Sequence, residues 1–388
     1  MKIILPESVK HILSRLNQRG FSAYAVGGCV RDMIMGRTPN DWDMCTSARP
    51  EELQAAFSDH RVIETGLKHG TLTVLVKGAP YEVTTYRIDG EYTDHRRPES
   101  VTFVSDLALD LARRDFTVNA MAADDGGIVD LYGGQEDIAR KIIRCVGEPE
   151  ARLTEDALRI LRAVRFASTL DFTVHPDTAA AMKRLAPTLG NVSMERIWQE
   201  LKKFLLGPGC GRLIGEFPEV IRVFLPEADL SGDIDRLPRE FPLRLAHLLR
   251  NLPVPEAERI LKRLKSDNDT LVRVKNACAG YAMPLPTDRE SALRLLAKAG
   301  ETGALDACAL RGADDGQVLA AIAEGACYSV KMLAVTGRDL AAVGIKNGPG
   351  MGRTLAHLLE EVISGRTQNE QEALLALALA HTDEEVKP

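Results

Sequence analysis

The sequence lacks an excess of positive charge, because its 49 Lys and Arg residues are outnumbered by 55 Asp and Glu residues, for a net charge of −6. This balance argues against a histone-like protein that binds nucleic acid by overall charge, although it leaves room for local basic surfaces. The sequence also lacks an apolar run of transmembrane length, and its N-terminus lacks the apolar core of a signal peptide. We therefore expect a soluble cytoplasmic protein that makes no membrane contact.

Cysteine pairs are missing too. The seven cysteines are scattered, none forms a Cys-x-x-Cys pair, and their number is odd. This pattern argues against a zinc site and a disulfide framework, and a reducing cytosol is the simplest compartment for it. At 388 residues the chain is long enough for two or more domains with sizeable cores.

The most informative stretch of the sequence is residues 26–43. A Gly27-Gly28 pair follows a predicted strand and precedes a short predicted helix that carries Arg31, and a turn then leads to Asp-x-Asp at 41–43. Glycines let a triphosphate approach the backbone, the helix N-terminus favours an anion, and Arg31 adds a fixed positive charge. A Gly-Gly pair alone is usually a plain turn, and a lone Asp-x-Asp is often a solvated surface feature. The prediction of a nucleotide site therefore depends on their occurring together.

The Asp-x-Asp sequence has the chemistry of a metal site. Because side chains alternate along a strand, Asp41 and Asp43 are expected to share one face, and neighbouring carboxylates repel each other unless a cation lies between them. Mg²⁺ is usually held by one or two carboxylates together with substrate phosphates. The β-rich runs 70–77 and 81–87 predict a hairpin. Glu82 in its second strand is a candidate third carboxylate, although a lone strand Glu more often faces solvent.

These motifs resemble the signature of the DNA polymerase β-like nucleotidyltransferases. More narrowly, Gly-Gly-x-Val-Arg-Asp at 27–32 with Asp-x-Asp downstream is similar to the class II tRNA nucleotidyltransferase and bacterial poly(A) polymerase family. The resemblance implies an α+β fold: a polymerase β-like head of mixed sheet and helices (1–130), then an all-α neck (131–190), body (191–275) and tRNA-binding tail (276–388). It also implies template-independent, Mg²⁺-dependent addition of the 3′-terminal CCA sequence to tRNA from CTP and ATP, with release of pyrophosphate.

A second motif, Arg-Arg-Asp-Phe-Thr-Val-Asn-Ala at 113–120, follows a predicted helix at 107–114. An Arg-Arg-Asp cluster alone is usually a surface ion-pair group, whereas the resemblance implies that Arg114 reaches the nucleotide. Residues 89–99 are polar and without period, which predicts an exposed loop. In the family a loop here matters for the switch to the final adenosine, so its presence argues against an enzyme that adds only cytidine.

A third motif lies in a long helix that is predicted to begin near Thr154. Thr154 is the expected N-cap, and Arg159, Arg162 and Arg165 step across the side opposite the apolar face. By itself this pattern is most simply an amphipathic helix with a solvated basic face. The resemblance implies instead that Glu-Asp-x-x-Arg, ending at Arg159, selects the incoming base, and that Arg162 and Arg165 hold phosphate or the stacked base.

Hydrogen bonding explains how this motif would choose a base. Asp156 and Arg159 are one helical turn apart and can present an acceptor beside a donor. Cytosine and adenine each offer an amino donor next to a ring-nitrogen acceptor, whereas uracil and guanine offer a carbonyl beside a ring N–H. A site built for one hydrogen-bond pattern can penalise the wrong partner by roughly 10⁴. The pair would therefore admit C and A and refuse U and G.

The C-terminal half is Leu- and Ala-rich and predicts helices almost to its end. Basic residues within 202–203, 244–250 and 256–265 could line an RNA track, although ordinary solvated helix faces are the simpler interpretation. His247 is expected to be a buried or half-buried helix residue, since this chain lacks the His-Asp phosphohydrolase motif that some relatives carry. Residues 335–352 resemble the tail of the family.

Three alternatives to full CCA addition remain open. A poly(A) polymerase shares every catalytic motif and would add many adenosines, and a partial enzyme would add only the terminal adenosine. A catalytically silent tRNA-binding protein is the third, and it is disfavoured because it has no reason to keep three mutually repelling carboxylates. The predicted site consists of the catalytic residues Asp41, Asp43 and Glu82, with the two aspartates as metal ligands, and of the nucleotide-binding residues Gly28, Arg31, Arg114, Asp156, Arg159, Arg162 and Arg165.

Overall fold

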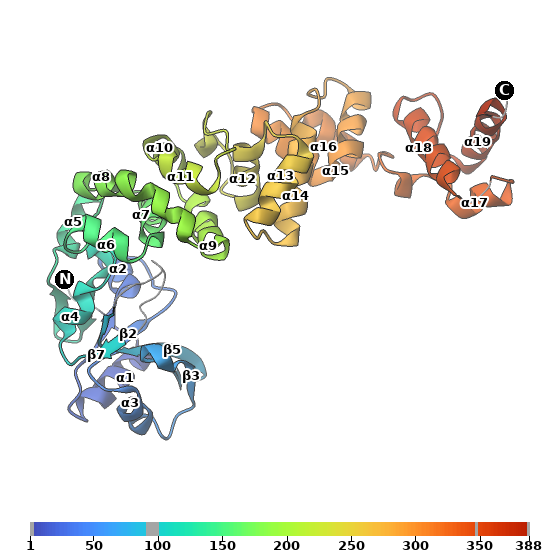
Figure 1. The fold of residues 1–388 in the computed structure, drawn as a ribbon. Helices are drawn as coiled ribbons and strands as arrows, with labels where there is room; N and C mark the ends of the chain where they lie inside the picture. Colours follow the sequence, from blue (N-terminus) through green and yellow to red (C-terminus); the bar gives the residue numbers. More distant parts are fainter. Residues whose placement is uncertain (1–3, 91–100, 346–347, 386–388) are drawn as a thin grey trace. The chain divides into compact units, whose positions relative to one another are not determined.

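The structure is a computed structural model that describes residues 4–90, 101–345 and 348–385. The chain forms two compact units, Met1–Pro226 and Glu227–Pro388 (Figure 1). The predicted loop at 89–99 falls almost entirely outside the described residues, and the division into head, neck, body and tail stays a prediction. Within the described ranges, no helix has both the length and the apolar character needed to cross a membrane.

A seven-stranded mixed sheet is the centre of the first unit. Its order is β3-β4-β5-β2-β1-β8-β9, in which β2 and β5 are parallel and every other neighbouring pair is antiparallel. The predicted hairpin is confirmed as β4 and β5. The strands are β1 (Ala23–Val26), β2 (Asp43–Thr46), β3 (Val62–Gly66), β4 (Thr71–Val76), β5 (Ala79–Thr85), β8 (Met121–Asp124) and β9 (Gly127–Asp130).

The two faces of this sheet are covered differently. One face packs against α1 (Glu7–Asn17) and α3 (Pro50–Ala56), which lie together on one side of the sheet in Figure 1. The spacing of an amphipathic helix buries Val9, Ile12, Leu13 and Leu16 of α1 there. The opposite face carries a smaller cluster around Tyr86 and Leu111, which leaves room for polar chemistry on that side.

The remaining elements of the first unit are mostly helices. Strand β7 (Val101–Phe103) pairs with β6 (Arg87–Asp89), and β10 (Ile142–Ile143) pairs with β11 (Thr173–Val174). The helices are α2 (Gly28–Ile34), α4 (Leu107–Ala112), α5 (Gly134–Arg140), α6 (Pro149–Glu155), α7 (Leu158–Leu170), α8 (Pro176–Leu185), α9 (Met194–Leu205), α10 (Cys210–Glu216) and α11 (Pro218–Phe224).

The predicted start of the third-motif helix at Thr154 is wrong. Thr154 lies inside α6, where its hydroxyl donates to the Glu150 carbonyl. The chain is extended at Asp156, with φ −139° and ψ 105°, and α7 begins only at Leu158. The side chain of Asp156 accepts from the backbone N–H of Leu158 at 3.1 Å, as a capping residue does. Asp156 thus stands at the junction of two helices rather than inside one.

Helices make up the regular secondary structure of the second unit in its described residues, as the sequence predicts. His247 is only 3% exposed and Arg244 1% exposed, so the first is a core residue as expected and the second is not available to an RNA track. The helices are α12 (Phe241–Leu249), α13 (Val254–Arg263), α14 (Asn268–Tyr281), α15 (Arg289–Arg311, kinked at Gly300), α16 (Gly316–Ala323), α17 (Gly337–Ala342), α18 (Pro349–Ile363) and α19 (Gln371–Glu385).

Candidate active site

Three carboxylates gather on the less covered face of the sheet. Asp43 begins β2, Glu82 lies on β5, and the two residues are direct partners across the parallel strand pair. Trp42 and Met44 pack into the core on the opposite face, so the predicted alternation holds around Asp43. Asp41 lies in the bend just before β2, which corrects the expectation that both aspartates belong to the strand.

The two aspartates raise the pKa of neighbouring carboxylates. Desolvation by the surrounding protein raises the pKa of Asp43, Arg114 pulls it down, and Asp41 pushes it up. The pKa of Glu82 is raised first by desolvation and then by Asp43 and Asp41. All three side chains are exposed, and no hydrogen bond or ion pair joins them to another residue in the part of the chain that the structure describes. Their negative charge is therefore largely uncompensated.

The donor set fits a hydrated, hard cation better than a complete protein cage. Among the described residues no group of three or more His, Cys, Asp or Glu side chains is arranged to hold an ion by itself. Mg²⁺ keeps several waters and is commonly bound by one or two carboxylates plus substrate phosphates. Asp41 and Asp43 provide such carboxylates, and Glu82 adds negative charge beside them.

Arg114 lies between the carboxylates and the glycine turn. A Cβ built on Gly27 would come within 3.0 Å of the Nη1 atom of Arg114, and Gly27 has a φ of +79°. The backbone conformation therefore favours glycine there, and any side chain at this position would crowd the end of Arg114. Arg114 donates to the buried Asp110 at 3.2 Å, while its buried Nε has no hydrogen-bond partner among the described residues. Gly28, the next residue, begins α2.

Arg31 leaves α2 toward the interior of the first unit and is only 9% exposed. Its Nη1 donates to the side chain of Asn119 at 2.6 Å, and its Nε and Nη2 donate to Asp32 at 3.0 and 2.8 Å. Asn119 belongs to the same motif as Arg114, so the structure brings together the two motifs that the resemblance links to the nucleotide. The guanidinium is held in one place before any nucleotide is present.

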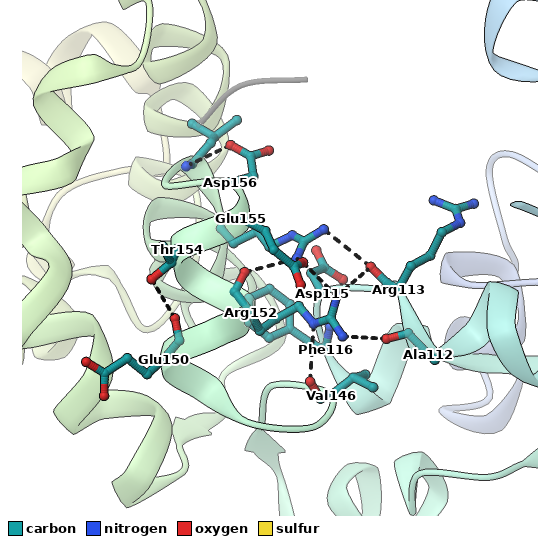
Figure 2. Close-up of polar contacts among 12 residues, drawn as sticks. Ala112, Arg113, Asp115, Phe116, Val146, Glu150, Arg152, Thr154, Glu155 and Asp156 are labelled. Atoms are coloured by element: carbon teal, nitrogen blue, oxygen red, sulfur yellow. Dashed lines mark hydrogen bonds and ion pairs between the residues drawn. The ribbon is translucent and has the colours of Figure 1, made fainter. Parts of the chain in front are cut away.

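Asp156 and Arg159 have different partners. Arg196 of α9 donates to both carboxylate oxygens of Asp156, at 3.3 and 2.7 Å. Arg159 donates to Glu155 at 2.5 Å and to the Arg113 carbonyl at 3.3 Å. Figure 2 shows Glu155 beside Arg152, with which it forms an ion pair, whereas Asp156 lies apart from both and accepts from the backbone of α7. The backbone N–H of Arg159 donates to the Asp156 carbonyl at 2.9 Å, but the two side chains do not bond to each other.

The other two arginines of α7 are also paired, so the simple interpretation of a solvated basic face is wrong. Arg162 donates from Nε and Nη2 to Asp115 at 2.9 and 2.5 Å, and Arg165 donates from Nε to Glu200 at 2.8 Å. Burial would raise the pKa of Asp115, but Arg162 outweighs it and holds that pKa at about 2. Glu200 lies on α9, which packs beside α7 (Figure 1).

Sequence reasoning missed the acidic partners of these arginines. Asp110 binds both Arg113 and Arg114, and this pairing had a signal, because the three residues are spaced i, i+3 and i+4 along a helix. Asp115 and Arg162 are 47 positions apart, so nothing local in the sequence could pair them. The same holds for Arg196 and Asp156.

Comparisons with known proteins agree with this geometry. Three protein-family models match the chain. The Poly A polymerase head domain matches residues 23–144, and the probable RNA and SrmB-binding site of polymerase A matches residues 171–215. The putative tRNA nucleotidyltransferase domain 2 matches residues 244–378. A CCA-adding enzyme of Limosilactobacillus fermentum is 37% identical, with 96% of each chain covered, and one of Geobacillus stearothermophilus is 39% identical, with 94% of each covered. The chain belongs to the CCA-adding enzyme family.

A solved structure of this family has the same fold. The crystal structure of the Bacillus stearothermophilus CCA-adding enzyme in complex with CTP superimposes with a TM-score of 0.80 at 34% identity, covering 98% of this chain and 99% of that one. The predicted α+β fold with a nucleotidyltransferase head is therefore confirmed. Nucleotidyltransferases generally use divalent metal ions. The exposed carboxylates of Asp41, Asp43 and Glu82 agree with such a use in this family.

Proposed function

We propose that this protein adds the 3′-terminal CCA sequence to tRNA, using CTP and ATP and releasing pyrophosphate. The observation that carries the proposal is the set of unpaired carboxylates just before β2, at its start and on β5, close to Arg114, which also lies beside the glycine turn. This set lies in a chain that matches CCA-adding enzymes along almost its whole length. Because its substrate is tRNA, we place the enzyme in the cytoplasm.

The carboxylates and arginines divide the chemistry between them. Asp41 and Asp43 would hold Mg²⁺, which when bound lowers the pKa of the RNA 3′-hydroxyl and offsets charge on the leaving pyrophosphate. Gly28 lets the triphosphate approach the backbone, and Arg31 and Arg114 bind its negative charge. The RNA 3′-oxygen then attacks the α-phosphate, and the bond to pyrophosphate breaks.

Asp156 and Arg159 would recognise the base with the acceptor and donor groups that their protein partners do not occupy. Arg196 and the Leu158 N–H occupy only part of the acceptor capacity of the Asp156 carboxylate. No hydrogen bond to a described residue occupies the Nε–H of Arg159. An acceptor and a donor thus remain, which is the pattern that cytosine and adenine complement and that uracil and guanine do not.

The proposal is tested with an end-labelled extension assay. Purified protein and Mg²⁺ are given tRNA transcripts that lack CCA or end in C or CC, together with CTP, ATP, both, UTP or GTP. We expect addition of three nucleotides and then a stop, and a requirement for both CTP and ATP. Growth only from the CC end would indicate an A-adding enzyme, a long adenosine ladder a poly(A) polymerase, and tight binding without extension a silent tRNA-binding protein.

A further inference from the structure

One aromatic ring contacts three of the proposed nucleotide-binding arginines. Phe166 of α7 is 7% exposed, and the guanidinium carbon of Arg165 lies 3.4 Å from its ring centroid. The guanidinium carbons of Arg31 and Arg162 each lie 5.4 Å from the same centroid. A guanidinium within about 6 Å of an aromatic ring is attracted to its negative face. Phe166 is thus a common neighbour of cations from α2 and from α7.

These contacts complement the carboxylate pairs. A guanidinium donates hydrogen bonds only along its edge, whereas its flat face can stack on an aromatic ring. Asp32, Asp115 and Glu200 each hold one edge of Arg31, Arg162 and Arg165 respectively. The ring adds a second contact that does not use the edge. Each arginine can therefore be fixed while some of its N–H groups stay available.

Arg165 shows this division most clearly. Its Nε donates to Glu200 at 2.8 Å and its face stacks on Phe166, and neither terminal nitrogen has a hydrogen-bond partner among the described residues. Burial lowers the pKa of Arg165, Glu200 raises it, and the like charge of Arg162 lowers it again. Guanidinium groups that repel one another need an opposing attraction to stay together before an anion arrives.

We propose that Phe166 is a positioning residue for nucleotide binding, whose ring holds Arg31, Arg162 and Arg165 in place for the triphosphate. This inference rests on the proposed function. It differs from a plain core role, in which any apolar side chain of similar volume would serve. The attraction comes from the ring quadrupole, so withdrawing electrons from the ring weakens it without removing the ring.

The test replaces Phe166 with mono-, di- and trifluorophenylalanine, and with Tyr and Leu. Phe116 is the matched control, because it packs edge-on against Phe166 at 5.8 Å and is another buried ring of the same unit. KM and kcat for CTP, the Kd of CTP without tRNA, and the melting temperature are measured for each protein. The two sites receive the same fluorinated residues.

We expect KM and Kd for CTP to rise stepwise with fluorination at Phe166, reaching about tenfold for the trifluoro residue. We expect kcat to change less than twofold, the melting temperature to stay constant, and Phe166→Tyr to behave like the wild type. Equal CTP affinity across the series, a KM rise that follows the melting temperature, or the same rise at Phe116 would overturn the inference. Failure of the wild type to bind CTP would instead overturn the proposed function, and this inference with it.

Discussion

The two sides of the candidate site are in opposite electrostatic states. On the sheet side, Asp41, Asp43 and Glu82 are exposed and their side chains have no polar partner among the described residues, and Asp41 and Asp43 raise the pKa of Glu82. Around α7, the buried or half-buried arginines each have an acidic partner. The carboxylates on the sheet thus repel one another until a cation binds. The arginines around α7, in contrast, are already neutralised and held in position by their acidic partners.

This difference suggests how the protein distributes stability and function. Carboxylates that repel one another cost folding free energy, which is acceptable where a bound metal recovers it. Buried ion pairs contribute little net stability, but losing one partner leaves an uncompensated charge and costs several kcal/mol. We therefore expect equivalent Asp substitutions on the two sides to have opposite effects on stability.

The largest expected effect is on catalysis. Asp41→Ala should lower nucleotide addition by roughly 10³-fold or more, because a bound metal ion supplies several kcal/mol of charge stabilisation. The affinity for tRNA should stay within a few fold, since the helical second unit is unchanged. Asp125→Ala, an exposed Asp of the same unit, is the matched control for the extension assay. Turnover retained in Asp41→Ala would show that the metal ligands lie elsewhere.

The second effect is on base selection. Asp156→Ala should relax discrimination against UTP and GTP by roughly 10²- to 10⁴-fold, because it removes the acceptor that an amino group needs. The comparison of kcat/KM for the four nucleotides measures this change, with the exposed Asp177→Ala as control. A variant as selective as the wild type would place base selection outside Asp156.

The third effect is on stability in the paired region. Asp115→Asn should lower the free energy of unfolding by about 2 kcal/mol, since the half-buried Arg162 loses its carboxylate partner at 2.5 Å and keeps only Glu200 at 3.7 Å. The pKa of Asp115 is about 2 in the folded protein and near 4 in the unfolded chain, so the wild type has this contribution above pH 4 and loses it as pH falls toward 2. The deficit of the variant should therefore shrink by about 1 kcal/mol between pH 6 and pH 3.

Urea unfolding of both proteins across that range measures the difference. A deficit that does not change with pH would mean that the charge of Asp115 contributes nothing. A variant as stable as the wild type would contradict the burial of the ion pair.

The smallest expected effect is a gain in stability, opposite to the loss expected for Asp115→Asn. Asp43→Asn should raise the free energy of unfolding by up to about 1 kcal/mol in metal-free buffer, because it relieves repulsion with Asp41 and Glu82. Since the pKa of Asp43 is raised, the gain should be absent at low pH and appear as pH rises through that pKa. Urea unfolding with EDTA at pH 4 and pH 8 tests this. A loss of stability in Asp43→Asn at pH 8 would contradict the strained state of the carboxylates.

The sequence predicts the sheet side of the site better than the helix side. Asp43 and Glu82 follow from strand alternation and hairpin spacing, which are local rules, and the structure has them as direct partners. The helix start at Thr154 was wrong because Asp156 takes an extended conformation supported by Arg196, a residue 40 positions away. Propensity and periodicity carry no information about such a distant partner. The cation–π contact of Arg31 with Phe166 escapes prediction for the same reason.

We infer that the exposed aspartates bind a divalent cation together with the nucleotide. Electron paramagnetic resonance of Mn²⁺ measures this binding in wild type and Asp43→Asn, with and without a non-hydrolysable CTP analogue. We expect the analogue to strengthen Mn²⁺ binding to the wild type, and we expect Asp43→Asn to weaken that binding by about tenfold or more. Equal Mn²⁺ affinity in the two proteins, with the CTP analogue bound, would contradict this inference.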